Sequence, residues 1–202
     1  ILSGLVGSEM CIRDRVHTFD EELFINCPDD VDLFGYYQSE KYFKHIENEI
    51  RSDFTFREEL IELCDSFIKD NFVYRDVISL HIRRGDYVLN PNHPTQDVEY
   101  YRQALKRMPD LPVIVFSDDP EWCNNQEIFS SDRFAISEGN TTDTDLCLMS
   151  LCNYHIIANS SFSWWGAWLA KSEKVIAPKN WFSGDCVGKS VEDMVFDNFE
   201  FL

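Results

Sequence analysis

The chain has 202 residues, of which 44% are hydrophobic, so it can bury one sizeable core and is long enough for one domain plus part of another. Its formal net charge of −18 repels polyanions, which argues against nucleic acid or an anionic membrane surface as a partner. A small anionic ligand would need a local basic site.

The start of the chain and its cysteines indicate further what class of protein this is. The chain begins at Ile1 rather than Met, which predicts a fragment, and residues 1–15 share no periodicity with the rest of the chain, so we interpret them as a non-native extension. No signal peptide or membrane-spanning segment is expected. The seven cysteines form no CxxC pair and no spacing typical of zinc, which predicts reduced, mostly buried thiols in a cytoplasmic protein.

Two features precede the first strong strand signal. Residues 29–43 gather five aromatic side chains around one glycine, and these rings either stack on sugars or fill the space between two domains. Residues 55–70 then predict an amphipathic helix. Its apolar face would consist of Leu60, Leu63, Cys64, Phe67 and Ile68.

Residues 77–82 form an apolar run rich in β-branched side chains, which predicts a buried strand of a parallel sheet. The run ends at Arg83, Arg84, Gly85 and Asp86. Ligands of open α/β sheets bind beyond the carboxyl ends of the strands, and two guanidinium groups there suit phosphate oxygens. Gly85 allows a tight turn, and Asp86 either holds an arginine or takes part in chemistry. The alternative is an ordinary surface ion-pair cluster.

Strands and helices alternate from residue 77 to residue 177 with short connections, which predicts parallel strands joined by right-handed crossovers. Further strands are expected at 112–116, 134–136, 154–158 and 174–177. The helices between them are expected to begin after Asp97, after Asp119, near Asp145 and after Ser160 or Ser161. Residues 181–202 show no motif. The predicted fold class is α/β, with a parallel-sheet, Rossmann-like nucleotide-binding domain.

The junction after the fourth strand is a second candidate site. A strand that enters a helix through hydroxyl residues presents N–H groups and hydroxyls at the positive end of the helix dipole, which suits an anion. Capping would explain one serine, but there are three: Ser160, Ser161 and Ser163. Asp118 lies at the tip of the second strand, and Asp145 is either a helix-dipole charge or a ligand contact. No dinucleotide fingerprint, P-loop, metal motif or evident magnesium site is present.

At this point a resemblance is evident. Residues 81–87 (HIRRGDY) are similar to the HxRRxD motif of the α-1,2-, α-1,6- and protein O-fucosyltransferases, and the Gly-Asp-Tyr ending resembles the bacterial α-1,2-fucosyltransferases of glycosyltransferase family 11. Four further blocks agree with that family in order. They are 35–43 (GYYQSEKYF), 116–123 (FSDDPEWC), 145–167 with its NSSFSWWGA core, and 175–182 (VIAPKNWF).

The resemblance implies the C-terminal half of a GT-B glycosyltransferase. Residues 76–202 would be the GDP-fucose-binding domain, and residues 16–75 would be a remnant of the acceptor-side domain with a connecting helix. The family's glycine-rich opening segment is absent, so the chain is expected to be N-terminally truncated. By position, Arg83 would contact the donor diphosphate and Ser160 or Ser161 a phosphate oxygen. The other donor-binding residues would be His81 and Asp145 on the guanine side, Asp118 at the nucleoside, Arg84 and Ser163.

The implied reaction is an inverting, metal-independent transfer of L-fucose from GDP-β-L-fucose to the 2-hydroxyl of a terminal galactose, with no cofactor besides the donor. Arg83 and Asp86 are the candidate catalytic residues, although the base could instead lie in the missing N-terminal part. The expected partners are GDP-L-fucose and a galactose-terminated glycan, without nucleic acid. The expected location is cytoplasmic, with peripheral association with the inner membrane left open. The alternatives are a binding module without turnover and a fucosyltransferase that makes another linkage.

Overall fold

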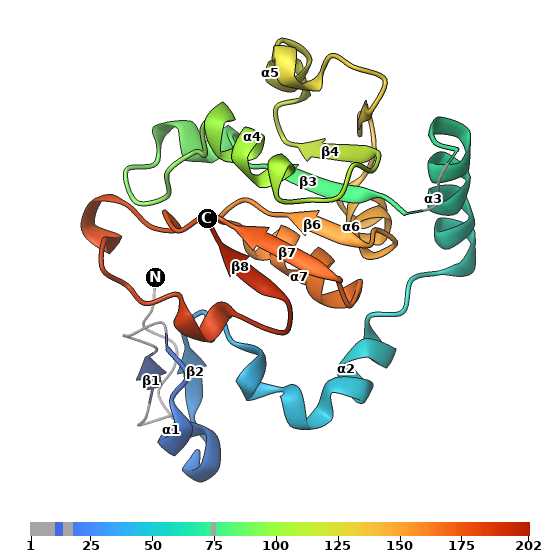
Figure 1. Ribbon diagram of the computed structural model, residues 1–202. Helices are drawn as coiled ribbons and strands as arrows, with labels where there is room; N and C mark the ends of the chain where they lie inside the picture. Colours follow the sequence, from blue (N-terminus) through green and yellow to red (C-terminus); the bar gives the residue numbers. More distant parts are fainter. Residues whose placement is uncertain (1–10, 14–17, 74–75) are drawn as a thin grey trace. The chain divides into compact units, whose positions relative to one another are not determined.

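The computed structural model describes residues 11–13, 18–73 and 76–202 (Figure 1). The chain divides into two compact units, residues 1–50 with 188–195 and residues 51–187 with 196–202. The expected division at residues 15 and 75 stays a prediction. Most of the segment that we interpret as an extension lies outside the described residues, and only Cys11–Arg13 is described, as strand β1.

The first unit is small and held together by aromatic side chains. Strand β1 pairs in parallel with β2 (Asp32–Phe34). The rings of Phe19 and Tyr37 lie 4.8 Å and 5.5 Å from the ring of Tyr42, so part of the aromatic segment packs within this unit. The helices that belong to it or begin in it are α1 (Glu21–Asn26), η1 (Glu40–Tyr42), η2 (Lys44–Ile46), α2 (Glu47–Asp53) and η6 (Glu192–Met194).

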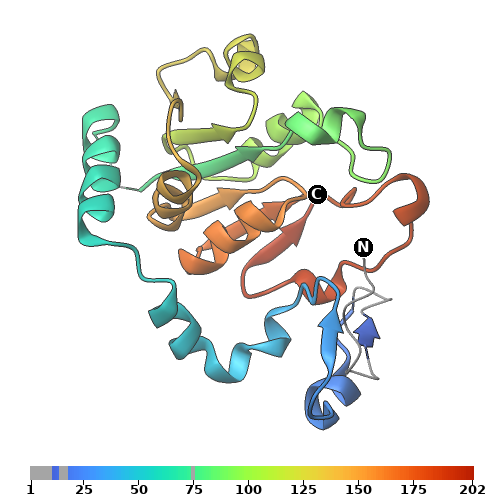
Figure 2. The ribbon, with the colours of Figure 1, turned by 180° about the vertical axis from the view of Figure 1, so that it is seen from behind.

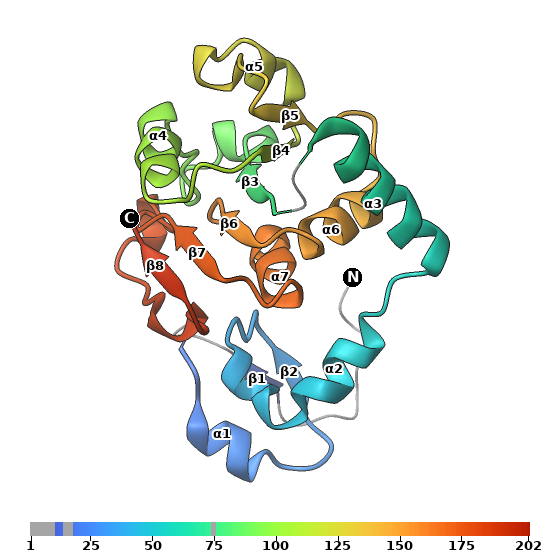
Figure 3. The same cartoon turned by 45° about the vertical axis from the view of Figure 1, so that its right-hand side comes forward.

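The second unit contains a six-stranded sheet whose paired strands all run parallel, in the order β5-β4-β3-β6-β7-β8 (Figure 3). The strands are β3 (Ile78–Ile82), β4 (Val113–Ser117), β5 (Phe134–Ile136), β6 (Tyr154–Ile156), β7 (Lys174–Ala177) and β8 (Phe199–Phe201). The five predicted strands are therefore confirmed. The sixth, β8, was missed: it lies in the tail that showed no motif, and it pairs with β7.

Helices cover both faces of this sheet because every second residue of a strand points to the same side. On β3, Ile78, Leu80 and Ile82 are fully buried in a core that includes residues of α4 (Val98–Lys106). On the other face, Val77, Ile114 and Phe116 share a core with α3 and α6. Figure 2 shows α6 and α7 in front of the sheet. This is the α/β, Rossmann-like architecture that the sequence predicts.

The remaining helices are α3 (Glu58–Asn71), η3 (Gly85–Leu89), α5 (Pro120–Asn124), η4 (Glu127–Phe129), α6 (Thr142–Ser150), α7 (Ser161–Leu169) and η5 (Gly184–Cys186). Asp97 and Asp119 cap α4 and α5 as predicted, each accepting a hydrogen bond from the backbone three residues on.

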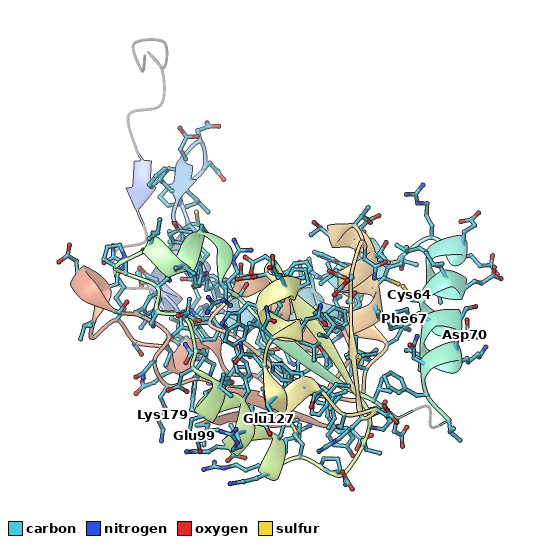
Figure 4. The ribbon with its side chains drawn as sticks, turned by 90° about the horizontal axis from the view of Figure 1, so that it is seen from above. Cys64, Phe67, Asp70, Glu99, Glu127 and Lys179 are labelled. Carbon is cyan, nitrogen blue, oxygen red and sulfur yellow. The ribbon has the colours of Figure 1, made fainter. Side chains whose placement is uncertain are left out.

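Helix α3 begins three residues later than the predicted 55–70. Cys64 faces α6, as Figure 4 shows, and its thiol donates to the carbonyl of Thr144 over 3.6 Å. Ile68 is also buried, but Leu63 is 57% exposed, so its assignment to the apolar face was wrong. The face that packs on α6 is centred on Cys64 and Ile68, and Leu63 lies to one side of it.

Candidate functional site

The strand order of the second unit contains one switch point, where the connections that leave two adjacent strands run toward opposite edges of the sheet. Numbered within the sheet, the order is 3-2-1-4-5-6, and β3 and β6 are the adjacent central strands. In such sheets the crevice beyond the carboxyl ends of the central strands is the usual ligand site. A pocket of about 510 Å³ lies there. Of the predicted site residues, it is lined by His81, Arg83, Asp86, Asp118, Asp145, Ser160 and Ser161.

Arg83 is held by carboxylates on two sides. Its Nη2 lies 2.5 Å from Oδ1 of Asp86, and its Nη1 lies 2.9 Å from Oδ2 of Asp118. The ring of Tyr87 lies 5.4 Å from the guanidinium carbon. An ion-pair cluster therefore does follow the first core strand, and it lines the pocket. Because the two carboxylates hold the guanidinium in one orientation, an anion that enters the pocket meets an oriented donor.

Asp118 also fixes the backbone of the loop after β3. Its Oδ1 accepts a hydrogen bond of 2.8 Å from the backbone N–H of Arg84. A Cβ on Gly85 would lie 2.5 Å from Oδ2 of Asp118, which is closer than real Cβ atoms come. A larger residue at position 85 would therefore displace the carboxylate of Asp118.

Arg84 turns away from the pocket. Its Nε donates to Asp119 over 3.0 Å, and its guanidinium lies 4.3 Å from the ring centre of Trp122. The hydrogen bond from Arg84 holds the pKa of Asp119 below its usual value. The predicted role of Arg84 in donor binding gains no support from this geometry, since Arg84 instead fastens the loop to α5.

Of the three serines at the start of α7, two line the pocket and one does not. Ser160 occupies the N-cap position with extended backbone, yet its side chain makes no capping hydrogen bond in the described part of the chain. Ser160 and Ser161 both line the pocket. Ser163 is fully buried and donates to the carbonyl of Ser160 over 3.3 Å, so it supports the turn from inside and does not line the pocket.

His81 and Asp145 bring one buried and one half-buried titratable group to the pocket. Burial, with a smaller effect of the nearby Arg83, lowers the pKa of His81 to about 3, so the imidazole is neutral. Among the described residues, its Nδ1 has no hydrogen-bond partner. Burial also raises the pKa of Asp145, although its Oδ1 accepts a hydrogen bond of 2.7 Å from Ser137. Both side chains therefore offer polar atoms that a ligand can pair.

Sequence reasoning missed six lining residues: Tyr87, Phe116, Ser117, Asn140, Thr142 and Phe162. Tyr87, Ser117 and Phe162 stand in or directly after segments that the sequence analysis singled out, so their position next to a strand end was an available signal. Within the described ranges, no group of three or more His, Cys, Asp or Glu side chains could hold a metal ion. None of the described helices is long and apolar enough to cross a bilayer.

Two solved structures share the fold of this chain. The NodZ α-1,6-fucosyltransferase soaked with GDP-fucose aligns with a TM-score of 0.53 at 18% identity, over 81% of this chain and 60% of that one. POFUT1 in complex with GDP aligns with a TM-score of 0.51 at 14% identity, over 70% of this chain and 51% of that one. At these identities the likeness concerns the fold alone.

Curated relatives are closer in sequence. An α-1,2-colitosyltransferase of Escherichia coli is 42% identical over 165 residues, which is 75% of this chain and 56% of the relative. The O-antigen biosynthesis glycosyltransferase WbnK of Escherichia coli is 36% identical over 80% of this chain and 58% of the relative. Galactoside α-(1,2)-fucosyltransferase 1 of Lagothrix lagotricha is 27% identical over 87% and 53%. The chain thus spans between half and three fifths of the length of these relatives.

The model of one family, described as glycosyl transferase family 11, matches residues 6–197, which is nearly the whole chain. The match includes the strands, the arginine loop and the serine turn that form the pocket. On this match and on the relatives above, the chain belongs to glycosyl transferase family 11.

Proposed function

We propose that this chain is the donor-binding part of an enzyme that transfers L-fucose from GDP-β-L-fucose to the 2-hydroxyl of a terminal galactose, with inversion. One observation carries the proposal: Arg83, Ser160 and Ser161 line the same pocket at the carboxyl ends of β3 and β6. The α-1,2 linkage in the names of the relatives supports the choice of acceptor hydroxyl.

The chemistry requires charge stabilisation at the leaving group. The acceptor oxygen forms a bond to C1 of the sugar while the bond from C1 to the diphosphate oxygen breaks, and negative charge grows on the diphosphate. Arg83 faces that charge as a fixed cation, and the start of α7 adds the positive end of a helix dipole with two hydroxyls. Preorganised donors of this kind contribute on the order of 10²–10³ in rate.

The proton of the acceptor hydroxyl must also leave. Asp86 lines the pocket and is a candidate base, but its ion pair of 2.5 Å with Arg83 equally suits an orienting role. On the nucleoside side, His81, Asp145 and Asp118 would contact the guanosine, since each of them lines the pocket.

The donor site can be tested with the chain as it stands. Arg83→Ala should weaken GDP binding at least tenfold in a calorimetric titration, because a charge-assisted contact to phosphate contributes about 1.5–3 kcal/mol. Arg102→Ala is the matched control, since Arg102 also pairs with an acidic residue three positions away, Glu99, but does not line the pocket. Equal GDP affinity in wild type and Arg83→Ala would refute the donor assignment.

A second candidate donor follows from the colitosyltransferase, which at 42% is more similar to this chain than the fucosyltransferase at 27%. Colitose is fucose without its 3-hydroxyl, so both nucleotide sugars would present the same diphosphate to Arg83. Parallel turnover assays with GDP-fucose and GDP-colitose on a galactoside acceptor distinguish the two donors. Linkage analysis of the product distinguishes a 2-linked from another sugar.

A third candidate is a binding fragment without turnover, because the chain covers only part of its relatives. GDP binding without transfer would favour it. Metal independence is also part of the proposal and predicts that any transfer by this chain survives EDTA. A cytoplasmic location stays a prediction.

A further inference from the structure

A buried asparagine fastens several loops together beside the pocket. Asn159 is 1% exposed and directly precedes Ser160. Its side-chain amide donates to the carbonyls of Pro94 and Trp181 over 3.1 Å and 3.0 Å, and its Oδ1 accepts from Gln96 over 3.2 Å. The turn that carries the pocket serines is thereby fixed to the segments before α4 and after β7.

The backbone carbonyl of Asn159 points to the other half of the pocket. It accepts a hydrogen bond of 3.1 Å from the hydroxyl of Tyr87, a residue of η3 that follows the arginine loop. The hydroxyl of Tyr87 thus links the connections after β3 and β6 on the side of the arginine loop, in addition to the links that Asn159 makes with Pro94 and Gln96 farther along the first connection.

Tyr87 is suited to hold the loops after β3 and β6 at a fixed separation. Its ring lies 5.4 Å from the guanidinium carbon of Arg83 and stacks on the ring of His93, with centroids 5.2 Å apart and planes at 27°. A tyrosine has only two side-chain torsions, so a ring packed in this way presents its hydroxyl at a set distance. The same residue lines the pocket.

We propose that Tyr87 is a positioning residue for a nucleoside diphosphate. Its hydrogen bond to Asn159 sets the separation between the guanidinium of Arg83 and the hydroxyls of Ser160 and Ser161. A diphosphate has to engage both groups at once, whereas a monophosphate engages one of them at a time. The inference rests on the proposed function, because it takes the diphosphate of a nucleotide as the ligand of this pocket.

The test compares GDP with GMP on Tyr87→Phe, in the full chain, by calorimetric and competition titrations. The substitution keeps the ring, its stacking and its contact with Arg83, and removes only the hydroxyl. We expect GDP affinity to fall about three- to tenfold, as for one lost hydrogen bond, and GMP affinity to stay within about twofold. The decisive quantity is the ratio of the two affinities, which a general loss of stability would not change.

Tyr100→Phe is the matched control. Tyr100 is buried, and its hydroxyl donates to the carbonyl of Ile157 over 2.7 Å and to that of Ile176 over 3.2 Å. Ile157 directly follows β6, and Ile176 belongs to β7. This variant loses a tyrosine-to-carbonyl hydrogen bond without touching the link between the two loops. We expect a lower melting temperature and an unchanged ratio of GDP to GMP affinity.

Two results overturn the inference alone: wild-type affinity for both nucleotides in Tyr87→Phe, or an equal loss of GDP and GMP affinity, since either one leaves the affinity ratio at its wild-type value. If wild type does not bind GDP, or if Arg83→Ala binds it as tightly as wild type, the proposed function fails and takes the inference with it. The two failures are therefore distinguishable.

Discussion

The close approach of Gly85 to Asp118 makes Gly85→Ala a sharp test of how the arginine is held. The added Cβ would lie 2.5 Å from Oδ2 of Asp118 and 3.2 Å from its Cγ. Ordinary contact begins at 3.4 Å, so the carboxylate has to retreat by about 0.9 Å (3.4 − 2.5). The same oxygen lies 2.9 Å from Nη1 of Arg83, so its displacement disturbs the ion pair that orients this arginine.

The expected magnitude follows from the lost contact. A hydrogen bond between charged groups contributes about 1.5–3 kcal/mol, and the side chains of Arg83 and Asp118 are 35% and 25% exposed, so solvent screening favours the lower value. With Arg83 no longer oriented, GDP affinity should fall about tenfold. Because Asp118 lies at the surface end of β4, the free energy of unfolding should change by only about 1 kcal/mol.

The assay is a double-mutant cycle measured by GDP calorimetry on wild type, Gly85→Ala, Asp118→Ala and the double variant. In the Asp118→Ala variant the carboxylate that the added Cβ would meet is gone, so introducing Gly85→Ala there should change GDP affinity less than twofold. Urea denaturation of each variant checks that it folds. Additive effects of the two substitutions, or wild-type affinity in Gly85→Ala, would refute the reasoning.

Three further predictions concern stability and the neighbouring arginine. Leu63→Ala should change the free energy of unfolding by less than about 0.5 kcal/mol, whereas Ile68→Ala should cost about 2–4 kcal/mol in urea denaturation, because the first side chain is 57% exposed and the second 5%. Burial lowers the pKa of His155 to about 4 from 6.5, so the unfolded chain binds more protons between these values. Stability should therefore fall as the pH drops from 6.5 to 4, by up to about 3 kcal/mol, and His155→Gln should flatten that slope in pH-dependent melting curves. Arg84→Ala should lower the melting temperature through its lost contacts with α5, yet reduce GDP affinity less than Arg83→Ala in the same titration, and a larger loss would contradict the orientation described above.

Much of the sheet was predictable because its central strands are fully buried. The residues of β3 and the first four of β4 are hidden on both faces, so they read as continuous apolar runs with strong strand signals. Strand β8 gives no such signal, since its three residues, Phe199–Phe201, have a glutamate at their centre and are half-buried. Its assignment depends on pairing with β7, a long-range contact that a local pattern does not contain.

The site was predictable to the level of loops, but not of individual side chains. Both neighbouring arginines looked suited to phosphate, yet only Arg83 lines the pocket. Alternation along β3 could have separated them, because His81 and Arg83 fall on one side while Ile82 and Arg84 fall on the other. The serine turn was also ambiguous, since helix capping and anion binding both favour serine. The two roles are distinguished only by the structure, in which the side chain of Ser160 makes no capping hydrogen bond among the described residues.

The central position of β3 has a consequence for how the chain assembles. Ile78 stands opposite Val113 on one side and Tyr154 on the other, and no ladder of this sheet is a hairpin that could close early. Chains with such long-range pairing fold slowly, on the scale of milliseconds to seconds. Arg83 and Ser160 line one pocket only once β6 has joined β3, so nucleotide binding should not appear before that step of refolding. Added nucleotide should then favour the assembled chain in proportion to its occupancy.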